Sequence, residues 1–187
     1  MKYKTTFHLF TLTAVIGRLL MPQTAYAAGT ITVNNITDLL ADDGQCSLRE
    51  AVIAANTDTA TGGCPAGNGA DVIVFDSALS TPAVFTLTLT GANEDNAETG
   101  DLDLTDILTI QGGNANQIII DGNGTDRIFD IRPGATVIIS GVTVRNGNLG
   151  AAYLPSGILK ISPPRSLRVR WKWHAAEFRM DRFPLVT

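Results

Sequence analysis

The stretch Leu102–Asn148, LDLTDILTIQGGNANQIIIDGNGTDRIFDIRPGATVIISGVTVRNGN, decides the fold of this chain. Short apolar runs begin at Leu108, Ile118, Ile128 and Val137, at offsets of 10, 10 and 9 residues (118−108, 128−118, 137−128). Turns containing Gly, Asn, Asp or Pro separate the runs. Runs this short and this regular indicate β-strands rather than helices.

Two architectures fit such evenly spaced strands: a sandwich of antiparallel hairpins, or a chain that coils into a parallel β-helix. The continuous apolar run Ile118–Ile120 favours the coil, because a strand packed between a coil above and a coil below needs continuous apolar stripes. We therefore predict a mainly β chain built as a short parallel β-helix.

Composition and charge divide the chain into unlike parts. Hydrophobic residues make up 44% of the 187 residues and aromatic residues 6%, which suits a β-rich core of Ile, Val and Leu. Residues 28–159 carry 4 basic and 16 acidic side chains, a net −12 (4−16), whereas residues 160–187 carry 7 basic and 2 acidic ones, a net +5 (7−2). The overall charge of −4 hides this difference.

Residues 1–27 resemble an export signal. Lys2 and Lys4 give a positive start, Phe7–Leu20 is mostly apolar, and Ala25–Ala27 is a small-x-small cleavage pattern. The apolar stretch is too short for a transmembrane helix, and a soluble amphipathic N-terminus is the alternative. The sequence predicts a secreted or cell-surface protein without a transmembrane segment in the mature chain.

Residues 28–70 are predicted to form an N-terminal cap. Within Cys46–Asn56, Ser47 and Glu50 have the spacing of a capping box at the start of an amphipathic α-helix. A single helix of about nine residues is not stable alone in water, so it must lie on an apolar surface. The open end of a β-helix is such a surface.

Cys46 and Cys64 are the only cysteines of the sequence. In an exported chain we expect them to form a disulfide that closes an 18-residue loop (64−46) and contributes about 3 kcal/mol. Metal binding is the alternative, but no histidine or third cysteine lies nearby.

The chain resembles exported bacterial proteins that begin with a Cys-Ser-Leu-Arg-Glu-Ala motif and continue as right-handed parallel β-helix repeats of the pectate-lyase-like type. The match covers roughly Thr30–Asn148. The residues that carry it are Cys46–Asn56, Gly100–Leu104, Asp121-Gly122, Asp126–Phe129, Gly134–Val137 and Ser140–Val144. The resemblance implies a right-handed β-helix at the cell surface or in the medium, without a settled biochemical activity.

The repeat pattern is expected to cover residues 71–150 and to end there. Residues 151–187 contain three prolines before Arg165 and the basic run Arg165–His174, which holds both tryptophans. We expect an irregular tail. It is either the truncated or out-of-frame end of a longer repeat protein, or a segment that attaches to membranes or nucleic acid.

Catalytic chemistry has few candidate residues. Histidine occurs only at His8 and His174, both outside the coil, so general acid-base catalysis by imidazole is not expected there. Asp101, Asp103 and Asp106 are candidate Ca²⁺ ligands, because Ca²⁺ prefers carboxylate oxygens. Strand alternation would instead turn Leu102 and Leu104 inward and leave Asp101 and Asp103 in solvent.

These observations together predict a secreted or cell-surface β-helix module with a structural or adhesive role, as part of a longer repeat protein. Carbohydrate or cell-surface proteins are the expected partners, a specific nucleic acid is not, and no cofactor is expected apart from Ca²⁺. Self-association is expected at the uncapped last coil. The alternative is a Ca²⁺-dependent polysaccharide lyase or hydrolase of the same fold.

Overall fold

The computed structural model describes residues 28–91, 94–148, 152–153, 158–161 and 168–170. These residues form one helix and a series of short strands. In chain order the elements are β1 (Thr30–Val33), α1 (Leu48–Thr57), β2 (Asp71–Phe75), β3 (Ala83–Thr86), β4 (Leu102–Leu104), β5 (Ile107–Gln111), β6 (Ile118–Asp121), β7 (Phe129–Ile131), β8 (Thr136–Ser140), β9 (Thr143–Arg145), β10 (Ala152–Tyr153), β11 (Ile158–Ile161) and β12 (Arg168–Arg170).

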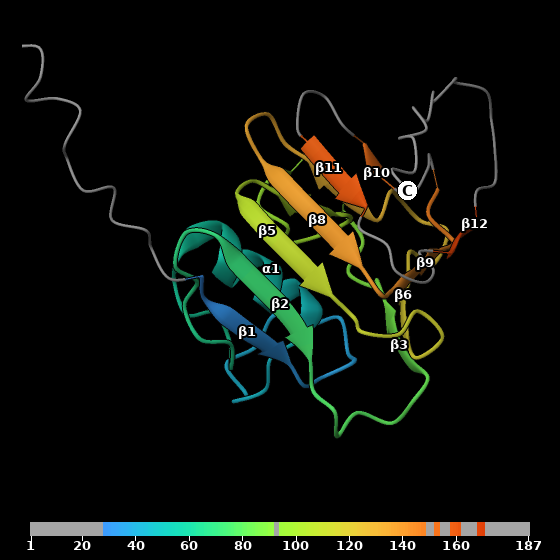
Figure 1. Cartoon of the computed structure of the whole chain (residues 1–187), viewed down its shortest axis with the longest axis horizontal. Helices are drawn as coiled ribbons and strands as arrows, with labels where there is room; N and C mark the ends of the chain where they lie inside the picture. Colours follow the sequence, from blue (N-terminus) through green and yellow to red (C-terminus); the bar gives the residue numbers. More distant parts are fainter. Residues whose placement is uncertain (1–27, 92–93, 149–151, 154–157, 162–167, 171–187) are drawn as a thin grey trace, which may run out of the picture.

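The strands form three parallel sheets (Figure 1). The first has the order β1-β2-β5-β8-β11, the second β3-β6-β9-β12 and the third β4-β7-β10. From β2 onward, the chain enters the first, second and third sheets in turn and then begins again. The prediction of a mainly β chain is confirmed, and the strands pair in parallel rather than as antiparallel hairpins.

The register reproduces the spacing of the apolar runs. Leu108 in β5 lies beside Val137 in β8, so paired residues of these two strands are 29 positions apart in sequence (137−108). This separation is the sum of the offsets 10, 10 and 9 between the apolar runs. The runs that begin at Ile118 and Ile128 lie between them, in the second and third sheets. Three successive apolar runs therefore make one circuit of the three sheets.

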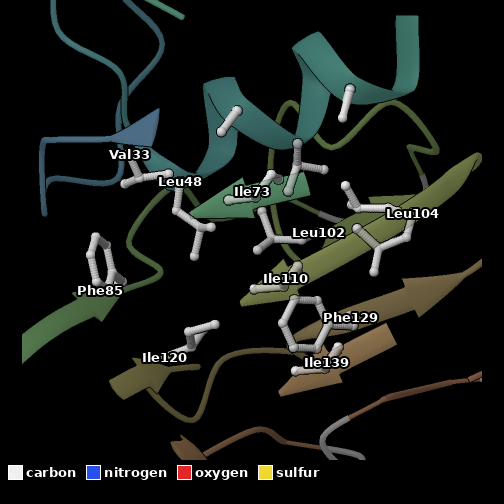
Figure 2. Packing of buried hydrophobic residues seen from close by; sticks show 14 of the residues in the cluster. Val33, Leu48, Ile73, Phe85, Leu102, Leu104, Ile110, Ile120, Phe129 and Ile139 are labelled. Atoms are coloured by element: carbon white, nitrogen blue, oxygen red, sulfur yellow. The ribbon is translucent and has the colours of Figure 1, made fainter. Parts of the chain in front are cut away.

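The core lies between the three sheets (Figure 2). Alternate strand residues point inward, so Ile73, Ile110 and Ile139 of the first sheet are almost fully buried. They face residues such as Ile120 of the second sheet and Phe129 of the third. A fully buried Ile, Leu, Val or Phe side chain stabilises the fold by about 1.5–3 kcal/mol. The core of the described residues contains twenty such side chains, together with buried alanines and the two cysteines.

Helix α1 lies against β1, β2 and β4, over the end of the core where these strands lie (Figure 2). Both hydrogen bonds of the predicted capping box are present: Glu50 N donates to Ser47 Oγ, and Ser47 N donates to the Glu50 carboxylate. The predicted disulfide joins Cys46 to Cys64, with a Cα–Cα distance of 4.7 Å. Within the described residues, no helix has both the length and the hydropathy that crossing a bilayer requires.

The prediction of an irregular tail from residue 151 is wrong for three segments. Strands β10, β11 and β12 pair in parallel with β7, β8 and β9, so each sheet gains one strand beyond the predicted boundary at residue 150. The physical reason is that the edges of β7, β8 and β9 offer unpaired backbone groups, which short β-prone segments such as Ile158–Ile161 can satisfy. The predicted signal, residues 1–27, and the rest of the tail lie outside the described residues.

Candidate functional site: a buried cluster of aspartates

Three aspartates meet on the third sheet. Asp101 precedes β4, Asp103 lies in β4, and Asp130 lies directly beside Asp103 in β7. One carboxylate oxygen from each lies within 4.8 Å of the other two. The three residues are only 5%, 0% and 2% exposed, respectively. Carboxylates of this kind are costly to bury without partners, so their surroundings decide what the cluster does.

The cluster is buried because a loop covers the outer face of β4. Leu102 and Leu104 point inward as expected, which turns Asp103 outward. Ala97, in the loop that precedes β4, then donates its amide to Asp103 Oδ2 over 3.1 Å. Glu94 holds the same loop by accepting backbone amides, including that of Thr99 at 3.0 Å. The prediction that Asp101 and Asp103 face solvent is therefore wrong.

A buried arginine from the helix anchors this loop. Arg49 is fully buried, and its Nη1 and Nη2 donate to the carbonyl oxygens of Ala97 and Gly100, both at 2.9 Å. Its Nε donates to Asp38 Oδ1 at 2.6 Å. Arg49 thus joins the helix, the segment before it and the loop over the acidic cluster. Sequence reasoning missed this role; an arginine among the small and apolar residues of a short helix was the available signal.

Two further arginines compensate part of the negative charge. Arg127 Nε lies 2.8 Å from Asp101 Oδ2, and Arg132 Nη1 lies 3.1 Å from Asp130 Oδ2. Arg127 Nη2 also approaches Asp130 Oδ2, at 3.5 Å. The arginines therefore bind the Oδ2 atoms of Asp101 and Asp130. Among the described residues, Oδ1 of Asp103 and Oδ1 of Asp130 are buried without a hydrogen-bond partner.

Its surroundings make Asp103 an unfavourable place for a negative charge. Burial raises the pKa of Asp103 to about 7, although the Ala97 amide opposes the rise. The neighbouring Asp101, Glu94 and Asp130 carboxylates contribute to the same rise. A proton on Asp103, or a cation shared by the cluster, would relieve the repulsion.

The sequence identified two of these three residues. Asp106, the third predicted Ca²⁺ ligand, does not join the cluster; its Oδ1 accepts the amide of Ile107 at 2.7 Å. Asp130 takes that place because it lies next to Asp103 in the neighbouring strand. Their separation of 27 residues (130−103), close to one circuit of the sheets, was the signal that could have found it.

Comparison of the chain with protein-family models, curated proteins and solved structures gives no match. The resemblance to exported proteins with the Cys-Ser-Leu-Arg-Glu-Ala motif therefore stays a prediction.

Proposed function

We propose that the chain is a short right-handed parallel β-helix that serves as a structural or adhesive module outside the cytoplasm, within a longer repeat protein. The repeated order of the three parallel sheets supports the β-helix. Right-handed crossovers are expected because almost all parallel strand connections have this hand. The export-like residues 1–27 and the Cys46–Cys64 disulfide support an oxidising location.

The observation that carries the structural role is the way charged side chains are used. Asp121 in β6 and Arg145 in β9 are register neighbours, and their side chains form an ion pair at 2.8 Å. Arg127 and Asp101 form another across the third sheet. A catalytic carboxylate or arginine must contact the substrate, whereas these groups are engaged with partners on the next turn. Their arrangement stabilises the stacking of turns.

The outer face of the first sheet is the surface that we propose for partners. Strand alternation places two rows of side chains on this face, and each row crosses β1, β2, β5 and β8. The rows are Thr30-Val72-Thr109-Ile138 and Thr32-Val74-Gln111-Ser140. All eight residues are at least partly exposed. Hydroxyl, amide and methyl groups alternate along these rows, which suits a carbohydrate with both hydroxyl groups and C–H faces.

A binding experiment with matched variants tests this surface. The full chain is applied to an array of surface polysaccharides, together with Gln111→Arg and the control Gln117→Arg. Both glutamines are exposed, but Gln117 lies in the turn before β6, away from the two rows. We expect the first variant to lose carbohydrate binding and the second to keep it. Equal binding by both variants, or no binding by the unchanged chain, would contradict the proposed surface.

A second assay separates the structural module from a polysaccharide lyase. The chain is incubated with pectate-type polymers and Ca²⁺, and the absorbance of unsaturated products is followed. We expect no increase in absorbance. A steady increase in absorbance that disappears when Arg127 or Asp101 is changed would contradict the structural role and support a lyase.

A further inference from the structure

We propose that Asp101, Asp103 and Asp130 bind one Ca²⁺ ion, which joins two successive turns of the third sheet. Asp101 and Asp103 belong to the turn that contains β4, whereas Asp130 belongs to the turn that contains β7. The ion would therefore act as a cross-link between turns. This inference does not depend on the proposed partner surface.

The unpartnered oxygens point to a ligand beyond the acidic character of the cluster. Asp103 Oδ1 and Asp130 Oδ1 are buried, have no hydrogen-bond partner among the described residues, and belong to side chains on adjacent strands in direct register. Leaving two such oxygens without a partner destabilises the fold, and more so when they are charged. A cation between the strands would satisfy both at once.

The arginines do not use every oxygen of the cluster. Arg127 and Arg132 contact the Oδ2 atoms of Asp101 and Asp130, whereas Oδ1 of Asp103 and Oδ1 of Asp130 have no hydrogen-bond partner among the described residues. An ionised carboxylate has about four lone-pair sites, so it can accept from an arginine and ligate a metal together. Three carboxylates against two guanidinium groups also leave an excess of negative charge, even before Arg132 is shared with Asp95.

The ligand type and the flexible coordination of calcium favour Ca²⁺ over Mg²⁺. One carboxylate oxygen of each residue lies within 4.8 Å of the other two, so a single ion can contact all three residues. Ca²⁺ accepts about six to eight oxygen ligands in a flexible geometry, whereas Mg²⁺ requires a near-ideal octahedron and loses its water reluctantly. A site built mainly from carboxylates on one face of a sheet therefore suits calcium better.

Calorimetry and thermal unfolding of the full chain test the site. After treatment with a chelator, titration with CaCl₂ should give saturable binding of about one ion with a Kd of about 0.1–1 mM, typical of extracellular calcium modules. At 10 mM CaCl₂ the Tm should rise by about 3–10 °C. MgCl₂ at the same concentration should raise it less.

Two variants identify the ligands. Asp103→Asn should lose the calcium-dependent rise in Tm. Asp106→Asn removes a carboxylate that follows β4 but lies outside the cluster, so this variant should keep the rise. Absence of a binding heat in the unchanged chain would overturn the proposal whether or not the variants fold. A calcium response that survives in Asp103→Asn would also overturn it. If calcium has no effect and Asp103→Asn unfolds at a higher temperature than the unchanged chain, the cluster holds a proton instead and the proposal fails.

Discussion

Arg49→Met should destabilise the protein more than any other single replacement of an arginine in the described residues. Methionine keeps an unbranched apolar stem but removes the guanidinium group. The Asp38 side chain, which is 3% exposed, would lose its ion pair, and the carbonyl oxygens of Ala97 and Gly100 would lose donors. Removing one partner of a buried ion pair costs about 3–5 kcal/mol, because the other charge stays buried and uncompensated.

Urea unfolding followed by circular dichroism measures this loss. For a chain of this length, it corresponds to a decrease in Tm of about 6–20 °C. Arg145→Met is the matched control, because the Arg145 side chain is 40% exposed and pairs with Asp121 alone among the ion pairs described. We expect the control to lose about 1 kcal/mol or less. The proposed role of Arg49 would be refuted if its replacement cost less than about 1 kcal/mol, or no more than the control.

Three further predictions concern the disulfide, a carboxylate and the core. Replacing Cys46 and Cys64 together by serine should lower the free energy of unfolding by about 3 kcal/mol, measured by urea titration. Burial raises the pKa of Asp121, but hydrogen bonds from the Asn123 amide, from Arg145 and from Asn146 outweigh it and lower this pKa overall. The advantage of the unchanged chain over Asp121→Asn should therefore be full at pH 7 and decline as the pH falls below about 4, in urea titrations at each pH. Phe129→Ala should cost about 3–5 kcal/mol by the cavity that it leaves, measured by the same titration.

Each of these predictions has a result that contradicts it. Identical unfolding curves with and without a reducing agent would show that the disulfide does not stabilise the fold. A constant difference between Asp121→Asn and the unchanged chain from pH 7 to pH 3 would contradict the lowered pKa. Ile107→Ala is the control for the core, since Ile107 is 51% exposed. A similar loss for Ile107→Ala and Phe129→Ala would contradict the assignment of Phe129 to the core.

Sequence patterns predicted the elements whose cause is local. The apolar runs predicted strands because they are short and regularly spaced, and the interval from Leu108 to Val137 equals the observed register of β5 and β8. Ser47 and Glu50 predicted the start of α1, since both hydrogen bonds of a capping box lie within four residues. These features depend on neighbours in sequence or on a regular repeat.

Features that depend on distant segments were not predicted correctly. Alternation suggested that Asp103 faces solvent, but it does not show that the loop containing Ala97 folds back over β4. The position of that loop depends on Arg49, which lies 48 residues earlier than Ala97. The composition of the tail suggested irregular structure. Composition alone does not show that β8 has an open edge, with which β11 pairs.

The stacked turns are tested most directly by NMR contacts between β5 and β8. In a parallel ladder the residue numbers of contacting pairs keep a constant difference. The structure gives a difference of 29 for every pair from Ile107 with Thr136 to Gln111 with Ser140. We expect nuclear Overhauser contacts between β5 and β8 to join residues whose numbers differ by about 29 along the whole length of both strands. Contacts whose residue numbers instead keep a constant sum would mean an antiparallel hairpin, and the β-helix, its partner surface and the calcium cross-link between turns would all be contradicted.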